Sequence, residues 1–344
     1  MQADLVRTPL GIVGVRTHTR CHAPRRNKQT QRIALQEKES YRWAALIDDV
    51  ASRMGRCAEV VHLLDREADN YLLLAHLMEH GRRFVVRATH KRQVTDQEGH
   101  RQPLADALAT LEGVFERQVP LSARLAPKRP KPSRRRNLPR QMRLARLSYA
   151  ATTLTLHKPK TKTPAPPNLT VHVVHVRELG TPQGAEPVDW VLYTTEPVAT
   201  RKDIERVVDL YRARWRIEEL FKALKTGCAL EKRQLESLST LLKALAIFLP
   251  MACDLLALRA LGLADPERPA WQVLDPMVMH VLERHPRSKL APHASIGQAM
   301  WAVARFGGHI RNNGTPGWMV LGRGYEKILI LADGLRLGME RVWG

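Results

Sequence analysis

Carboxylate side chains follow a short apolar run in the first quarter of the sequence. The run AEVVHLL (58–64) has the composition of a buried strand, and the segment DREAD (65–69) comes directly after it. Side chains that follow the strands of an open parallel sheet gather where the backbone turns outward, and a carboxylate there can hold a divalent cation. Asp69 is better placed to cap the helix that follows, whereas Asp65 lies too far ahead of that helix. Asp65 is therefore the candidate metal ligand.

Four further side chains are spaced to share one face of a helix. At about 100° per residue, offsets of 0, 3, 7 and 14 residues fall within a sector of about 60°. The sequence places a phenol, a guanidinium, a carboxylate and an ammonium at those offsets: Tyr211, Arg214, Glu218 and Lys225. A weak surface ion pair between Arg214 and Glu218 is the alternative explanation. Together with Asp65 and the basic stretch described next, the pattern favours a metal-binding carboxylate flanked by phosphate-binding cations.

Positive charge dominates the composition and is concentrated in one stretch. The chain has 55 Lys and Arg against 34 Asp and Glu, a formal net charge of +21. No acid lies between Glu116 and Glu178, and that interval holds fifteen Lys or Arg residues, among them Arg134, Arg135 and Arg136. A solvated loop would explain a generic charge run, but a run this long and of one sign favours contact with the phosphate backbone of DNA. It carries no information about sequence specificity.

The remaining composition excludes several classes of protein. With 344 residues, of which 44% are hydrophobic, the chain is expected to fold into two or three domains. Its four cysteines have no metal-binding or redox spacing, which fits a reducing compartment. The longest apolar run, 244–253, is too short to span a membrane and contains Pro250, and the first residues do not have a signal-peptide layout. We therefore expect a cytoplasmic protein that binds a polyanion.

The order of expected elements indicates an α/β core that is interrupted by a β-rich segment. An edge strand or hairpin (5–20), a helix that Ser40 caps and Gly55 ends, the strand before Asp65, a helix (70–80) and a strand (82–89) come first. Strand candidates at 149–156, 169–176 and 188–195 follow, and helices return at 203–227, 240–261, 296–306 and 325–335. The strand–helix–strand unit predicts parallel pairing in the core.

Three features that could suggest other sites have simpler explanations. His172 and His175 point to opposite faces of a strand, so they do not form a metal pair. The Gly307–Gly308 pair ends a helix. Trp190 fits a core position and a base-stacking position equally well.

Four segments carry a resemblance to a known family. They are EKESYRW (37–43), DREAD (65–69), RRFVVRATHKR (82–92) and YRARWRIEELFKALKTG (211–227), and the last contains the spacing Tyr-x2-Arg-x3-Glu-x6-Lys. With these segments the chain resembles DDE transposases of the insertion sequence 4 family over nearly its whole length. The resemblance implies an RNase H-like fold with a β-rich insertion between the second and third catalytic acids.

The resemblance also implies a mechanism and a role for each site residue. Asp65 would be the second catalytic acid and Glu218 the third, and they would hold two Mg²⁺ ions, for which Mn²⁺ may substitute, in cut-and-paste transposition. Tyr211, Arg214 and Lys225 would hold DNA phosphates. Arg87 and Trp190 would contact the terminal nucleotides, Trp190 by stacking on an unpaired base. Transposon ends and target DNA are the implied partners of a homodimer, in a bacterial cytoplasm close to the nucleoid.

One departure from the family pattern shapes the expected organisation. The family's first catalytic Asp has no counterpart, because Asp4 stands in the wrong context and 61 residues ahead of Asp65, so we expect an N-terminally truncated transposase. The expected domains are a first core part (1–91), a basic β-rich insertion (92–200), a second core part (201–262) and a helical C-terminal region (263–344). A DNA-binding or multimerising fragment that inhibits full-length transposase is the alternative function, and a decayed fragment is a third possibility.

Overall fold

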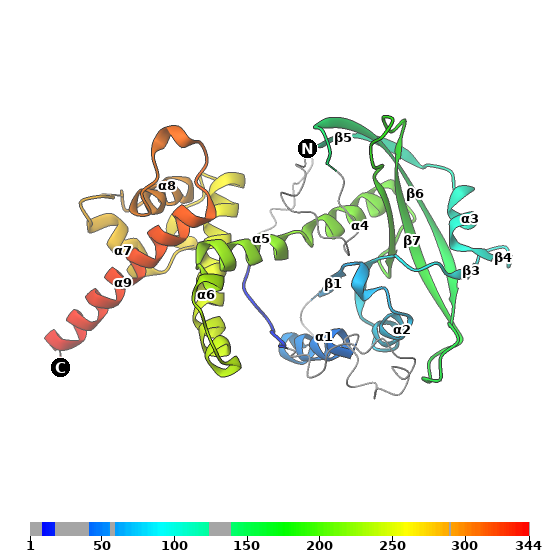
Figure 1. Ribbon diagram of the computed structural model, residues 1–344, viewed down its shortest axis with the longest axis horizontal. Helices are drawn as coiled ribbons and strands as arrows, with labels where there is room; N and C mark the ends of the chain where they lie inside the picture. The colour runs from blue at the N-terminus through cyan, green and yellow to red at the C-terminus, as the bar shows by residue number, and fades with distance from the viewer. Residues whose placement is uncertain (1–8, 18–40, 56–58, 124–138, 289, 344) are drawn as a thin grey trace. The chain divides into compact units, whose positions relative to one another are not determined.

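The computed structural model describes residues 9–17, 41–55, 59–123, 139–288 and 290–343. They form two compact units, which are coloured by residue number in Figure 1. The first unit comprises Gly14–Arg214 and contains the sheet; the second comprises the described part of Met1–Val13 together with Trp215–Gly344 and is helical. The division after Arg214 falls inside the predicted second core part, and the four predicted domain ranges remain predictions.

The first unit is built on strands β1 (Val61–Leu64), β2 (Arg83–Arg87), β3 (Gln93–Thr95), β4 (Arg101–Pro103), β5 (Phe115–Leu121), β6 (Arg143–His157), β7 (Asn168–Leu179) and β8 (Asp189–Thr194). They form one mixed sheet with the order β1-β2-β8-β7-β6-β3-β4, and β5 pairs with β6. β1 and β2 are parallel, as predicted, and the other pairings are antiparallel. β1 lies at one end of this order, and within the described ranges its outer edge has no partner strand.

Helices cover both faces of this sheet. On one face lie α1 (Tyr41–Met54), α2 (Tyr71–Glu79) and α3 (Leu104–Ala109), which share a core with Phe84 and Val86. On the other face, α4 (Arg201–Ala213) packs against Val85, as strand alternation requires. The mixed α/β class and these helix–sheet layers agree with the sequence prediction.

The structure confirms most of the predicted elements around Asp65. Asn70 caps α2 by accepting a hydrogen bond from the Leu72 N–H at 2.9 Å, and Gly81 follows α2 at a φ of +61°. The predicted cap Ser40 lies outside the described residues. The predicted edge strand or hairpin at the start of the chain is wrong for residues 9–17, which form no strand.

The predicted β-rich segment joins the core sheet directly. β6 and β7 form a long antiparallel pair, seen side by side in Figure 1, and β8 returns to pair with β2. The three long strand candidates are therefore confirmed. The sequence prediction missed β3, β4 and β5, because the first two are three residues long and β5 contains Pro120. Proline is tolerated there because β5 pairs on one side only.

The prediction of one continuous helix over 203–227 is wrong. α4 ends at Ala213, α5 spans Arg216–Lys222, and the turn Ala223–Gly227 is π-helical. The segment is therefore irregular at two places between Tyr211 and Lys225, around Arg214 and at the π-helical turn, so a repeat of 3.6 residues per turn does not hold along its whole length. Trp215 and Phe221 are 54% and 48% exposed.

The second unit is a cluster of helices around one apolar core. Its main helices are α6 (Leu238–Ala264), α7 (Pro276–Arg284), α8 (Ile296–Phe306) and α9 (Trp318–Trp343); the short helices Leu230–Lys232, Ala270–Gln272 and Arg311–Asn313 connect them. α8 and α9 approach closely through glycine: a Cβ on Gly307 would lie 1.9 Å from the Val320 carbonyl oxygen. The Gly307–Gly308 pair ends α8, as predicted.

α6 begins two residues before the predicted helix over 240–261, ends three residues after it and continues through Pro250, as that prediction implied. By length and composition alone α6 is apolar enough to cross a membrane, a feature that the search for an uninterrupted apolar run did not detect. Its second half lies in the core of the unit, with Leu255 and Leu258 fully buried. Its first half exposes apolar side chains, of which Ile247 is the most accessible at 68%.

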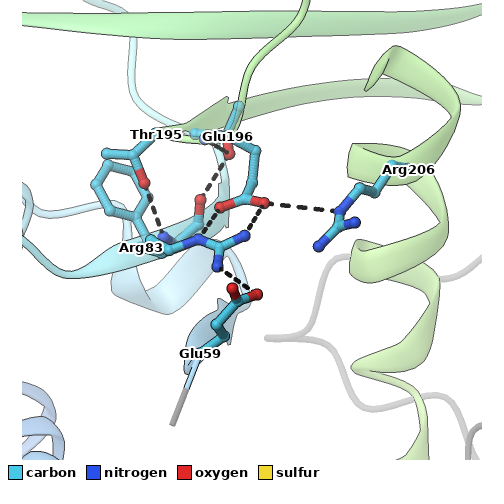
Figure 2. Close-up of polar contacts among 7 residues, drawn as sticks. Glu59, Arg83, Thr195, Glu196 and Arg206 are labelled. Carbon is cyan, nitrogen blue, oxygen red and sulfur yellow. Dashed lines mark hydrogen bonds and ion pairs between the residues drawn. The ribbon is translucent and has the colours of Figure 1, made fainter. Parts of the chain in front are cut away.

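A buried carboxylate joins β2, β8 and α4. Figure 2 shows Glu196, two residues after β8, between the guanidinium groups of Arg83 and Arg206. The Glu196 side chain is 2% exposed and accepts two hydrogen bonds of 2.7 Å from Arg83, which also contacts Glu59 at 3.3 Å. The charge of Glu196 raises the pKa of Arg83. This ion pair fixes the register of β8 on β2 and the start of α4.

Glu196→Gln is expected to lower the free energy of unfolding by about 2–3 kcal/mol, because it leaves a partly buried guanidinium without its charge partner. The matched control is Glu59→Gln, which removes the other carboxylate on Arg83. Because Glu59 is 85% exposed, the control should cost less than about 0.5 kcal/mol. Urea unfolding followed by circular dichroism measures both variants, and equal losses would refute the structural role of Glu196.

Candidate nucleic-acid and metal site

Asp65 lies at the end of β1, where the chain turns into a short 3-10 helix (Arg66–Ala68). Its Oδ1 atom accepts a hydrogen bond from the Glu67 N–H at 2.9 Å, so Asp65 caps this short turn, which the sequence analysis did not predict, and it does not cap α2. Within the described part of the chain its second oxygen has no hydrogen-bond partner, and the side chain is partly exposed. A carboxylate with one oxygen fixed and the other open is a suitable ligand for a hard divalent cation.

Asp69 has a different role from the one predicted. Asn70, and not Asp69, caps α2, while the Asp69 side chain is fully buried and forms an ion pair with Arg92. Its Oδ2 atom accepts hydrogen bonds from the N–H groups of Thr89 at 2.6 Å and His90 at 2.8 Å. Asp69 therefore holds the segment after β2. Arg92 is 23 residues away in the sequence, which is why local spacing could not reveal the pair.

A cavity of about 380 Å³ lies within the first unit, and Arg66, the residue after Asp65, is one of its lining residues. Its lining includes two carboxylates, Glu186 and Asp189, and the aromatic rings of Tyr149 and Trp190. Four arginines from different parts of the chain give the lining an excess of positive charge: Arg66 from the turn after Asp65, Arg87 from β2, Arg140 from the segment before β6, and Arg212 from α4. Guanidinium groups around an aromatic wall are suited to binding a nucleotide, whose phosphate and base need both.

Trp190 forms part of the cavity wall and is held there by its neighbours. The Arg87 guanidinium carbon lies 5.9 Å from the centre of the indole ring, and the Tyr211 ring meets Trp190 edge-on with centroids 5.5 Å apart. Tyr211 is only 6% exposed and belongs to the core cluster against which Trp190 packs. The sequence left open a core position and a base-stacking position for Trp190. In the structure its ring packs against the core of the unit and is partly exposed, so it has features of both.

Hydrogen bonds fix the strand positions around this cavity. Arg87 donates from Nη2 to the Asp189 carbonyl oxygen at 3.2 Å, and His175 Nε2 lies 2.8 Å from the Asp189 carboxylate. The contact with His175 lowers the pKa of Asp189. His172, predicted to lie on the opposite face of the strand from His175, has a different partner: its Nδ1 atom lies 2.9 Å from Thr153 Oγ1.

The signature residues after Tyr211 are divided between the two units. Arg214 ends the first unit, and its guanidinium carbon lies 5.7 Å from the centre of the Tyr211 ring. Glu218 is partly exposed on α5 in the second unit, and Lys225 lies in the π-helical turn, where it forms a 2.9 Å ion pair with Glu231. Arg87, Trp190 and Tyr211 therefore lie together in the first unit. Glu218 and Lys225 belong to the second unit.

No group of three or more His, Cys, Asp and Glu side chains that could hold a metal ion is found among the described residues. Asp65 and Glu218 each offer oxygen ligands of the kind that Mg²⁺ prefers.

The basic interval 117–177 is partly neutralised by the fold. Arg143 forms two 2.8 Å hydrogen bonds with the buried Glu178, and Arg146 pairs with Glu116 at 2.9 Å. Arg117 pairs with Glu205 of α4. Glu116 and Glu178, the two acids at the ends of the interval, therefore form ion pairs with arginines inside it. Arg134, Arg135 and Arg136 lie outside the described residues.

The sequence analysis did not single out Arg66, Arg140 or Arg212 as members of this site. Arg66 could have been predicted as a site residue, because it directly follows the candidate acid Asp65. Arg140 and Arg212 line the same cavity because β5 pairs with β6 and α4 packs on the sheet. Local sequence patterns do not predict such tertiary contacts.

The contrast between the two acids of DREAD gives a direct test. Asp69→Asn should lower the free energy of unfolding by about 3–5 kcal/mol, because it leaves Arg92 buried without a charge partner. Asp65→Asn should change it by less than about 0.5 kcal/mol, because Asn caps a helix as well as Asp does. Urea unfolding of both variants measures the difference, and a large loss for Asp65→Asn would mean that Asp65 is structural.

A comparison with protein families identifies the family of the chain. The family model described as the transposase DDE domain matches residues 20–249, which include Asp65, the cavity and the signature segment. That range covers about two thirds of the sequence. The chain belongs to the family of transposase DDE domains.

Proposed function

We propose that this chain is a cut-and-paste DNA transposase of the insertion sequence 4 group, with an RNase H-like core. The observation that carries the proposal is the arginine-rich cavity that Arg66, the residue after Asp65, helps to line. Arg66 directly follows the candidate catalytic acid and lines the same cavity as Trp190 and Arg87. A phosphodiester held by these side chains would lie next to a metal-binding carboxylate, as DNA cleavage requires.

In this proposal each side chain has one task. Asp65 and Glu218 would hold divalent metal ions, Mg²⁺ or Mn²⁺, which when bound activate water and then a DNA 3′-hydroxyl for attack on phosphodiesters. Arg66, Arg87 and Arg212 would hold phosphates around the cavity, and Arg214 and Lys225 would extend that contact. Trp190, supported by Tyr211, would stack on an unpaired base at the transposon end.

Among the described residues no strand pairs with the outer edge of β1, and this edge is where a third catalytic acid could be supplied. The ends of adjacent strands carry neighbouring side chains, so a strand added to the open edge of β1 could place a further carboxylate beside Asp65. We propose that such a strand completes the catalytic set of three acids. The same edge favours a second candidate function, in which the chain pairs with a complete transposase and inhibits it.

A plasmid-nicking and strand-transfer assay in Mg²⁺ and in Mn²⁺ tests this proposal. A version extended by a strand that bears the additional Asp should cut DNA, whereas the 344-residue chain should not. In the extended version, Asp65→Asn and Glu218→Gln should each reduce cleavage at least about a hundredfold, because a metal ligand is lost. The matched control is Glu219→Gln, next to Glu218 and paired with Arg216, which should keep activity.

Two results would decide against parts of the proposal. Cleavage by the 344-residue chain that disappears in Asp65→Asn would mean that another residue of this chain completes the site, with Asp4 the first candidate. Cleavage that survives both acid substitutions would overturn the catalytic assignment. Inhibition of a complete transposase by this chain, without cleavage of its own, would favour the second function.

The basic interval generates a separate prediction about non-specific binding. Replacing Arg134, Arg135 and Arg136 with Gln should flatten the dependence of log affinity on log salt by about 0.9 per lost phosphate contact. Arg117→Gln serves as the control, because Arg117 already pairs with Glu205 and should leave the slope unchanged. Binding of random duplex DNA at several salt concentrations measures both, and an unchanged slope in the triple variant would make the run a solvated loop.

A further inference from the structure

The second unit contains a separate cavity with the chemistry of a nucleotide site. Its volume is about 840 Å³, and α8 contributes one wall. Gln298, Trp301 and Arg305 line it at offsets of 0, 3 and 7 residues, the spacing of a single helix face. Leu290 and Ala291 line it with apolar atoms, while Ser288 and His309 complete the lining.

The aromatic part of this wall is preorganised. Trp301 is partly exposed and packs against the apolar core of the unit, and the His309 ring lies beside it with centroids 5.3 Å apart. The core therefore holds the indole ring in place while part of it remains accessible. A planar ligand could stack on such a ring at little entropic cost.

Two polar atoms at this cavity have no hydrogen-bond partner. Ser288 Oγ and His309 Nε2 are both buried, and neither is satisfied by any residue in the described part of the chain. Buried polar atoms of this kind are costly to leave unpaired, so they indicate where a ligand with donors and acceptors would bind. The edge of a nucleobase supplies both.

Charge selects an anionic ligand. Arg305 is exposed at the end of α8 and forms no ion pair with the described residues. Between positions 276 and 313 the sequence has five Lys or Arg residues and a single acid, Glu283. An aromatic surface, an unpaired guanidinium and two unsatisfied polar atoms together match a base with its phosphate.

We propose that this cavity binds one unstacked nucleotide of DNA, with the base on Trp301 and the phosphate on Arg305. The choice of DNA over a free nucleotide rests on the proposed transposase function, whereas the nucleotide chemistry rests on the cavity alone. The cavity would give the second unit a DNA contact of its own, independent of Asp65, Glu218 and Trp190.

Photocrosslinking locates this contact directly. The probes are a duplex with one extra, unpaired 5-iodo-deoxyuridine, the same duplex fully paired, and 5-iodo-deoxyuridine monophosphate. They are crosslinked to the full chain carrying Trp190→Leu, so that the first cavity does not contribute, and the products are mapped by mass spectrometry. We expect crosslinks at Trp301 or His309, at least about fivefold stronger with the unpaired base than with the paired duplex.

Matched variants keep the test decisive. Arg305→Gln should reduce the crosslink about fivefold or more, whereas Arg323→Gln, an exposed arginine on α9 of the same unit, removes the same charge and should not. In binding assays, Trp301→Leu should abolish the preference for the unpaired base, whereas Trp271→Leu should keep it, because Trp271 is 60% exposed and outside the cavity. If Trp301→Leu does not fold, the Arg305 pair carries the test.

The remaining outcomes each count against the proposal. Crosslinks elsewhere than at Trp301 and His309, or equal loss in both arginine variants, would overturn the nucleotide site. Equal crosslinking by the monophosphate at matched concentration would assign the cavity to a free nucleotide and overturn the DNA contact. Because none of these measurements requires cleavage, a failure here is distinguishable from a failure of the catalytic assignment.

Discussion

The buried ion pair between Glu196 and Arg83 controls the geometry of the first unit. A carboxylate with 2% exposure is stable only while its charge is compensated, so β8 cannot slide along β2 without separating the pair. The same constraint sets two other positions. Trp190, near the start of β8, is held beside Arg87 of β2, and α4 begins five residues after Glu196, which brings Arg212 to the cavity. One charged pair thus positions three walls of the candidate site.

Arginines in this unit have two kinds of position: some pair with buried acids, and others line the cavity of the candidate site. Arginines that pair with buried acids, such as Arg83 with Glu196 and Arg143 with Glu178, hold strands and helices together. Arginines around this cavity outnumber the carboxylates there, so an anion would be attracted to it. The high net charge of the chain is therefore only an upper limit on its contact with DNA. The positions of the arginines, more than their number, indicate where phosphates would bind.

Much of the fold could be predicted from the sequence where local pattern and tertiary packing agree. The strand before Asp65, the helix after Asn70 and the long strands around His172 and Trp190 have clear periodicity and clear ends. The prediction failed where tertiary contacts decide. Asp69 looked like a helix cap, but its partner Arg92 is distant in sequence. The break after Ala213 occurs among good helix formers, and no residue there marks it. The cavity was only partly predictable, because Arg140 and Arg212 meet through sheet pairing.

The central claim is that Asp65 is a metal ligand beside a DNA-binding cavity, and iron-directed cleavage of the protein tests it most directly. Fe²⁺ replaces Mg²⁺ in the presence of DNA and ascorbate, in the version extended by the additional strand, and hydroxyl radicals cut the backbone close to the metal. The account predicts cuts near residue 65 and near residue 218 that disappear in Asp65→Asn and persist in Glu219→Gln. Cuts elsewhere, or cuts near residue 65 that are unaffected by Asp65→Asn, would contradict it.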